Sequence, residues 1–158
     1  MEKQKGFSLL EVILAISALA LTSMFILQMF MVASELNGRA KDTDAAMAQA
    51  IASIEALKSY NSLDGYLSFV NGDGSGGSYG TTTDSEGKMI FCRYFDEKWQ
   101  PVDEDSAERR FFMELTLQEA KNDIVGQDGM LYAVSVHISG DKHTLADIQT
   151  MKYFTKGA

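Results

Sequence analysis

Cysteine, proline and histidine are scarce in this chain of 158 residues. Cys92 is the only cysteine, so an internal disulfide is excluded. His137 and His143 are the only histidines, and with Cys92 they lack the number and spacing of ligands that a zinc site requires. We therefore expect neither a metal nor any other cofactor. Pro101 is the only proline, so no proline interrupts a helix in the N-terminal half.

Residues that could perform catalysis are also poorly placed. Cys92 lies in an aromatic run and is expected to be a buried small hydrophobic residue rather than a nucleophile. Asp103, Glu104 and Asp105 form an acidic run without the paired geometry of general acid–base catalysis. No Gly-Lys-Ser/Thr sequence follows the glycine-rich segment, so a phosphate-binding loop is not predicted. The sequence indicates a protein that is not an enzyme.

Basic residues are fewer than acidic ones, 14 against 22, and the formal net charge is −8. General nucleic-acid binding relies on a basic patch that neutralises phosphates, which a chain this acidic does not provide. We therefore expect no direct nucleic-acid binding. Solubility outside the cell is sufficient to explain the acidity.

The most informative feature is a long apolar run near the N-terminus. From Val12 to Ser34 there is no charged residue, a stretch of 23. As a helix with a rise of about 1.5 Å per residue, this stretch covers roughly 35 Å, enough to cross the hydrocarbon core of a bilayer. The sequence therefore predicts one membrane-spanning helix.

The leader before this run differs from a secretory signal, in which the small-residue cleavage site follows the apolar region. Here the small residue, Gly6, precedes it, and Lys3 and Lys5 hold the leader on the cytoplasmic side. The sequence Gly6-Phe7-Ser8-Leu9-Leu10-Glu11-Val12, with the apolar run behind it, resembles the prepilin signature of type IV pilins and type II secretion pseudopilins.

This resemblance implies cleavage between Gly6 and Phe7 by a prepilin peptidase, followed by N-methylation of the new amine on Phe7. It also implies the partners: other pilins or pseudopilins in a helical filament, the peptidase, the membrane and an assembly platform protein. Two further stretches, AAMAQAIASIEALKSY and VSVHISGDKHTLADIQTMKYF, are diffusely similar to the minor-pilin V and pseudopilin I branch of this superfamily.

Glu11 is the exceptional residue of the apolar segment. A carboxylate costs about 2.5–3.5 kcal/mol near the bilayer centre and less near its edge, so it indicates a partner or a function. In a bundle of such helices Glu11 would meet the Phe7 amine of a neighbouring subunit and set the axial register, because an unpaired buried charge is strongly unfavourable. The alternative is that Glu11 reaches the membrane interface beside its own amine.

Beyond the membrane segment, a three-to-four-residue apolar spacing predicts that the helix continues to Tyr60, for a total of roughly 80 Å. The predicted apolar stripe comprises Leu36, Ala40, Thr43, Met47, Ala50 or Ile51, Ile54 and Leu57. We divide the chain into a leader (1–6), an apolar helix (7–34), its amphipathic continuation (35–62) and a globular head (63–158).

The head is expected to contain a glycine-rich surface loop and an antiparallel sheet. The loop, Asn71 to Gly87, does not match an EF-hand, so calcium is a minor alternative there, carried by Asn71, Asp73 and Asp84; a role in tip adhesion is another. Period-two patterns predict four strands, Met89–Phe95, Phe111–Gln118, Leu131–Ser139 and Thr144–Thr155, with Trp99 as a core or loop anchor between the first two. The predicted fold class is α+β: the long helix packed on a four-stranded antiparallel sheet, the architecture that the pilin resemblance also implies.

We expect a minor pilin, anchored by a single pass in the cytoplasmic membrane and then assembled into an extracellular or periplasmic filament. A pseudopilin of a secretion or competence system is the alternative within this class. Lack of a cysteine pair departs from many Gram-negative pilins and favours a Gram-positive or anaerobic source, or a pseudopilin. A monomeric membrane-anchored domain that binds a ligand is the alternative from another class.

Overall fold

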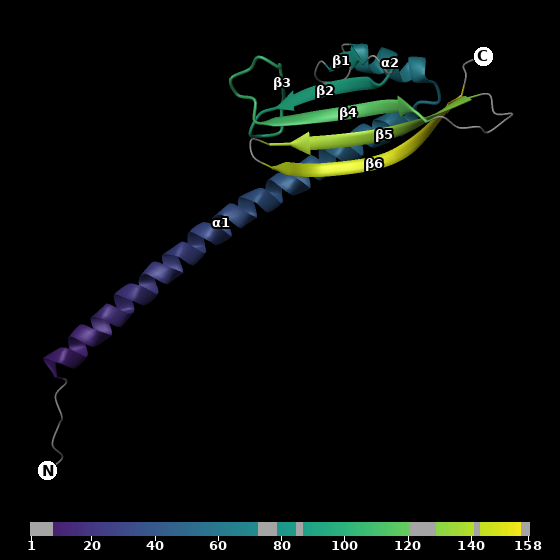
Figure 1. The fold of residues 1–158 in the computed structure, drawn as a ribbon. Coiled ribbons are helices and arrows are strands. Elements are labelled where there is room, and N and C mark those ends of the chain that lie inside the picture. Colours follow the sequence, from purple (N-terminus) through teal and green to yellow (C-terminus); the bar gives the residue numbers. More distant parts are fainter. Residues whose placement is uncertain (1–7, 73–78, 85–86, 121–128, 141–142, 156–158) are drawn as a thin grey trace. The chain divides into compact units, whose positions relative to one another are not determined.

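The computed structural model describes residues 8–72, 79–84, 87–120, 129–140 and 143–155. It divides into two compact units, Met1–Lys41 and Asp42–Ala158. The fold class is α+β, with a long apolar N-terminal helix and an antiparallel sheet (Figure 1). The predicted class is therefore confirmed at this level.

Helix α1 runs from Leu9 to Ser59 without interruption, a length of 51 residues. It ends one residue before the predicted end. Its second part is rich in alanine, the residue with the highest helix propensity. Gly38 lies inside the helix and does not end it, and a Cβ at this position would meet no neighbouring atom.

A second helix, α2 (Leu63–Asn71), was not predicted. The hydroxyl of Ser62 caps it by accepting a hydrogen bond from the backbone N–H of Gly65 at 3.3 Å. The polar residues around Ser62 indicated only the end of the long helix, although the same residue type also starts helices. The available signal was the helical spacing of Leu63, Tyr66 and Val70, of which the last two are buried.

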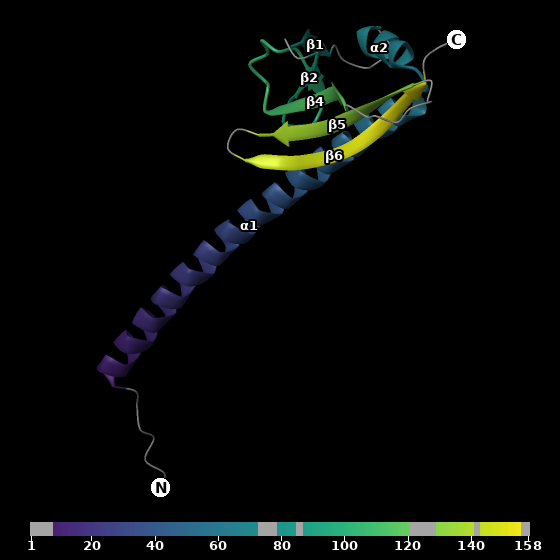
Figure 2. The ribbon, with the colours of Figure 1, turned by 45° about the vertical axis from the view of Figure 1, so that its right-hand side comes forward.

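Within the described residues the sheet has six strands, and five of them follow the order β1-β2-β4-β5-β6, while β3 pairs with β2. Each neighbouring pair is antiparallel. The four predicted strands are β2 (Met89–Phe95), β4 (Phe111–Glu119), β5 (Gly129–Ser139) and β6 (Thr144–Thr155). Figure 2 shows these strands turned relative to one another, as the normal twist of a sheet requires.

The count of four strands was too low. Strand β1 (Gly80–Thr83) lies in the segment predicted as a loop, and β3 (Pro101–Val102) lies in the connection after β2. Both are too short to produce a period-two pattern. Three threonines favour an extended backbone in β1, and Pro101 is tolerated because β3 pairs on one side only.

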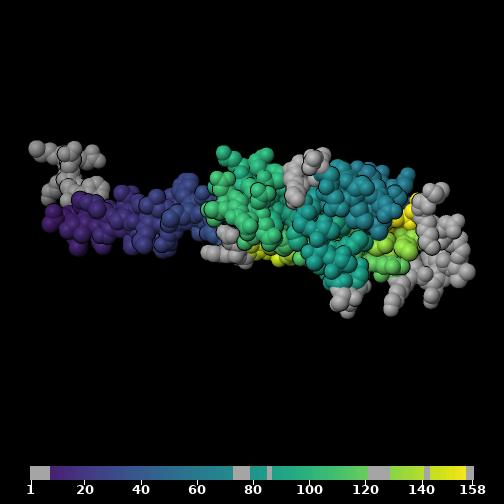
Figure 3. Space-filling model, turned by 90° about the horizontal axis from the view of Figure 1, so that it is seen from above, coloured from purple at the N-terminus to yellow at the C-terminus, as the bar shows by residue number. Residues whose placement is uncertain are grey.

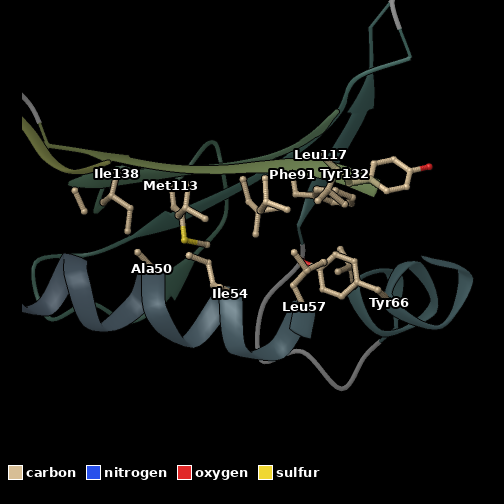
Figure 4. Close-up of a cluster of buried hydrophobic side chains, with 14 of the residues drawn as sticks. Ala50, Ile54, Leu57, Tyr66, Phe91, Met113, Leu117, Tyr132 and Ile138 are labelled. Atoms are coloured by element: carbon tan, nitrogen blue, oxygen red, sulfur yellow. The ribbon is translucent and has the colours of Figure 1, made fainter. Parts of the chain in front are cut away.

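The core lies between α1 and one face of the sheet. Ala50, Ile54 and Leu57 point toward Met113, Ile138 and other apolar side chains of the strands (Figure 4). The residues of α1 that are buried are Ala46, Ala50, Ser53, Ile54 and Leu57. The predicted stripe was therefore only partly correct, since Leu36, Met47 and Ile51 are exposed. The sheet covers a neighbouring row of the helix, in which alanine allows close approach.

Trp99 anchors the connection between β2 and β4, as predicted. Its ring is stacked on Phe111, with 4.1 Å between centroids and an interplanar angle of 11°. Trp99 has a left-handed backbone conformation, with φ at 62°. The carboxylate of Asp96 closes this turn by accepting from the backbone N–H groups of Lys98 and Gln100, each at 2.8 Å.

Candidate membrane and assembly helix

Ser8 determines where α1 begins. Its hydroxyl accepts a hydrogen bond from the backbone N–H of Glu11 at 3.3 Å, and its carbonyl oxygen accepts from the N–H groups of Glu11 and Val12 at 3.0 and 3.2 Å. A serine followed three residues later by glutamate is the sequence signature of a capping box. Ser8 was not among the predicted site residues, although this signature is present in the sequence.

Glu11 lies in the first turn of α1, where the helix dipole favours a negative charge. It is exposed and borders a shallow groove of about 320 Å³ whose other lining residues are apolar: Val12, Ala15, Ile16 and Leu19. Among the residues that the structure describes, no cation forms an ion pair with Glu11. Its carboxylate is thus free to meet a positive group from outside this part of the chain.

The apolar half of α1 is long and hydrophobic enough to cross a membrane. It contains an 18-residue window with a mean hydropathy of 2.3, and none of that window is buried. In Figure 3 the side chains of this half cover the purple and blue part of the helix. Those most exposed are Leu9, Leu10, Leu14, Ile16, Leu19, Leu21, Phe25, Leu27, Met29, Phe30 and Met31. This surface needs cover from lipid or protein.

Three hydroxyl groups within this half, those of Ser17, Thr22 and Ser23, bond to carbonyl oxygens of their own helix. Ser17 donates to the carbonyl oxygen of Ile13 at 2.8 Å, and Ser23 donates to that of Leu19, also at 2.8 Å. Thr22 lies within hydrogen-bond distance of the carbonyl oxygens of Ala18 and Leu19. Because each hydroxyl bonds to its own helix, these residues can face hydrocarbon without an unpaired donor.

Four residues predicted to take part in processing lie outside the described residues: Lys3, Lys5, Gly6 and Phe7. The contact between Glu11 and the Phe7 amine therefore stays a prediction. The structure places Glu11 in the first turn of a helix that begins at Leu9, within this motif.

Two of the residues considered for catalysis or metal binding, Cys92 and His137, lie on the face of the sheet opposite α1, whereas Asp103, Glu104 and Asp105 lie in the connection between β3 and β4. Cys92, Glu114, His137 and Asp147 face one another in cross-strand register on four neighbouring strands. His137 Nδ1 lies 3.9 Å from Asp147 Oδ2. Burial raises the pKa of the Cys92 thiol, and the nearby carboxylates of Glu114 and Glu104 raise it further, so the thiol stays protonated and weakly nucleophilic.

Across the described part of the chain, no group of three or more His, Cys, Asp and Glu side chains is arranged to hold a metal ion. His143 is exposed near the start of β6, apart from that row. Of the residues considered for calcium, Asn71 ends α2 and Asp84 accepts a hydrogen bond from the backbone N–H of Lys88 at 3.0 Å. Asp73 lies outside the described residues.

Comparison with known proteins finds no family model, no curated protein and no solved structure that matches this chain. The candidate site is therefore defined by its own chemistry: an uncovered apolar helix, an acid in its first turn, and a short charged leader before it.

Proposed function

We propose that this chain is a structural filament subunit of the type IV pilin class, specifically a minor pilin. The observation that carries the proposal is the continuous helix α1, which begins two residues after Phe7 and leaves its charge-free half uncovered. The Gly6-Phe7 junction and Glu11 occupy the positions that a prepilin peptidase and a filament would use. The family assignment comes from this sequence pattern.

The apolar half of α1 explains how one segment serves in two environments. Covering a large apolar side chain is worth about 1.5–3 kcal/mol, whether the cover is lipid or protein. The helix can therefore anchor the subunit in the cytoplasmic membrane and later exchange lipid for neighbouring helices at modest cost. The acidic head stays in water in both states, outside the membrane or on the filament surface.

Glu11 favours the transfer of the helix from lipid into the filament and sets the axial register of neighbouring subunits. In lipid its carboxylate is unfavourable, whereas in a filament it pairs with the methylated amine of Phe7 from a neighbouring subunit. The amine exists only after cleavage between Gly6 and Phe7, so processing must precede assembly. The assembly platform protein would extract such processed subunits from the membrane.

Two other functions compete with a minor pilin. A secretion or competence pseudopilin uses the same helix, cleavage site and acid, and the neighbouring genes would distinguish it. A monomeric membrane-anchored domain would instead bind a ligand. Two open grooves on the sheet, of about 410 and 370 Å³, are the features that favour this alternative. Such a domain would need neither cleavage nor Glu11.

Mass spectrometry of the protein isolated from its native membrane tests the proposal. We expect the mature chain to begin at Phe7, with the mass of one additional methyl group on its amine. We also expect it to occur in sheared extracellular or periplasmic filaments as well as in the membrane. A functional protein that retains residues 1–6 would contradict the proposal and favour the anchored ligand-binding domain.

A further inference from the structure

Strand β6 is a long edge of the sheet that is open along its middle, while Asn61 occupies its C-terminal end at Thr155. It has 12 residues, stands last in the strand order, and among the described residues pairs only with β5. Figures 1 and 2 both show it, in yellow, at the margin of the sheet. The opposite margin is β1, which has only four residues, so its shortness limits pairing.

One hydrogen bond shows which backbone groups of β6 point outward. The N–H of Thr155 donates to the carbonyl oxygen of Asn61 at 3.0 Å, and so points away from β5. In an antiparallel strand the N–H and C=O groups of alternate residues point to the same side. The backbone groups of Tyr153, Met151 and Gln149 therefore lie along the free edge.

The side chains at this edge are apolar and exposed. Met151 is 63% exposed and Tyr153 is 37% exposed. Their cross-strand neighbours on β5, Ala133 and Leu131, continue the apolar surface on the sheet face away from α1. The groove of about 410 Å³ lies beside Met151. Its lining residues are all uncharged: Thr116, Gln118, Ala133, Val134, Ser135, Gln149, Thr150 and Met151.

The usual devices that protect an edge strand are missing from the middle of β6. It has no proline, and its only charged residues are Asp147 and Lys152. The charge of Lys152 does not oppose pairing at this edge, because its Nζ donates to the carbonyl oxygen of Lys58 at the end of α1, 2.9 Å away. The register shift between β5 and β6 lies at Ile138 and Ser139, close to the far end of the strand.

We infer that β6 pairs antiparallel with β6 of a second copy of this chain, with Met151 opposite Met151, to form one continuous sheet. In this register Gln149 lies opposite Tyr153, and roughly six new backbone hydrogen bonds form. Pairing ends before Thr155, whose N–H already bonds to Asn61, and within the paired stretch Lys152 falls opposite Thr150, so no like charges meet. Centring the pair on Gln149 would instead place Asp147 against the apolar Met151.

This contact is a two-fold pairing of heads and is independent of the proposed filament. It requires neither cleavage at Gly6 nor the charge of Glu11. Two copies anchored in one membrane already have their heads on the same side, which favours their encounter. A strand from an unrelated protein is the competing occupant of this edge.

Single cysteines test the register in the full-length protein, in membranes and in detergent, after Cys92→Ala has removed the native thiol. Met151→Cys should form a disulfide dimer on mild oxidation, since residues opposite one another have Cα atoms within disulfide reach. Gln149→Cys alone should not, because its partner position is Tyr153. A mixture of tagged Gln149→Cys and untagged Tyr153→Cys chains should yield the mixed dimer.

Gln118→Cys is the matched control, since Gln118 is exposed on the same face but lies on β4, away from the edge. We expect at least a tenfold higher dimer yield for Met151→Cys than for this control. Equal yields would overturn the inference, as would dimer formation by Gln149→Cys alone at the level of Met151→Cys. Capture of Met151→Cys mainly by another protein would also overturn it, in favour of the foreign strand.

Discussion

The hydroxyl of Ser8 accepts a hydrogen bond from the backbone N–H of Glu11 at 3.3 Å, so the first acid of α1 is also part of the cap of that helix. Two roles for Glu11 follow. A local role stabilises the first turn, which needs a side chain that can accept hydrogen bonds near the N-terminus. An assembly role needs its full negative charge. Substitutions at Glu11 can separate the two.

Glu11→Gln should block incorporation into filaments as strongly as Glu11→Ala, at least tenfold. Glutamine suits a capping box almost as well as glutamate, but it has no charge with which to pair with an amine. Cleavage of the leader should be normal in both variants. The measurement is the ratio of subunit in sheared filaments to total subunit by immunoblot. If the glutamine variant assembles normally, the role of Glu11 is local.

Replacement of Gly6 by leucine should prevent cleavage, because a bulky side chain at the junction obstructs the peptidase at the membrane surface. The protein should stay in the membrane with residues 1–6 attached, as its intact mass would show. Gly38→Leu is the matched control, since a side chain at Gly38 of α1 would extend into open space. Efficient cleavage of the Gly6→Leu protein would contradict the assigned junction.

Leu57→Ala should lower the free energy of unfolding of the head by about 2–5 kcal/mol, because this side chain is fully buried between α1 and the sheet. Leu36→Ala makes the same chemical change at an exposed position and should alter it by less than about 0.5 kcal/mol. Urea denaturation of the full-length protein in detergent, followed by Trp99 fluorescence, measures both. Equal effects would show that Leu57 is not in the core.

Gly129→Ala should destabilise the head by about 1–3 kcal/mol, the usual cost of overpacking. A Cβ at this position would collide with the carbonyl oxygen of Phe154 and with the phenol ring of Tyr153. The ring can rotate away, whereas the backbone oxygen can move only with β6. The same denaturation experiment applies, with Gly38→Ala as the control expected to be neutral or stabilising. Unchanged stability of Gly129→Ala would contradict this close approach.

Stability should fall as the pH rises above about 9.5. Burial raises the pKa of Tyr66 well above its ordinary value, with a further contribution from Tyr79. Between the unfolded pKa of about 10 and the higher folded pKa, the native state binds more protons than the unfolded chain, so the free energy of unfolding decreases with pH. Below the unfolded pKa the contribution is constant.

Tyr66→Phe should remove most of this alkaline loss, because phenylalanine has no proton to release. Tyr153→Phe, at an exposed site, serves as the control and should keep it. Denaturation midpoints at pH 8 and pH 10.5 provide the comparison. An equally steep loss of stability in the Tyr66→Phe protein would assign the effect to other groups.

Local patterns were sufficient for much of the fold. β2 and β6 have the predicted bounds, and α1 ends at Ser59, one residue from the prediction. Alternation of apolar residues and alanine-rich helical spacing act over a few neighbouring residues, so they are readable in the chain. The same holds for the capping signature of Ser8 and Glu11, which lies within four consecutive residues.

Other features depended on contacts between distant segments. β1 exists because its threonines meet β2, and the row of α1 that faces the sheet includes Ala46 rather than Met47. The alignment of Cys92, Glu114, His137 and Asp147 across four strands follows from strand register, which no local pattern specifies.

The sequence by itself therefore determined the charge-free stretch of the long helix, the acid in its first turn and the position of the four long strands, because each depends on residues close together in the chain. Only the tertiary structure decided which face of α1 is buried, that Ser62 starts a second helix, and that β6 is the free edge carrying Met151 and Tyr153. Strand order and packing are set by which distant surfaces fit together, and that fit is not encoded in any single window of residues.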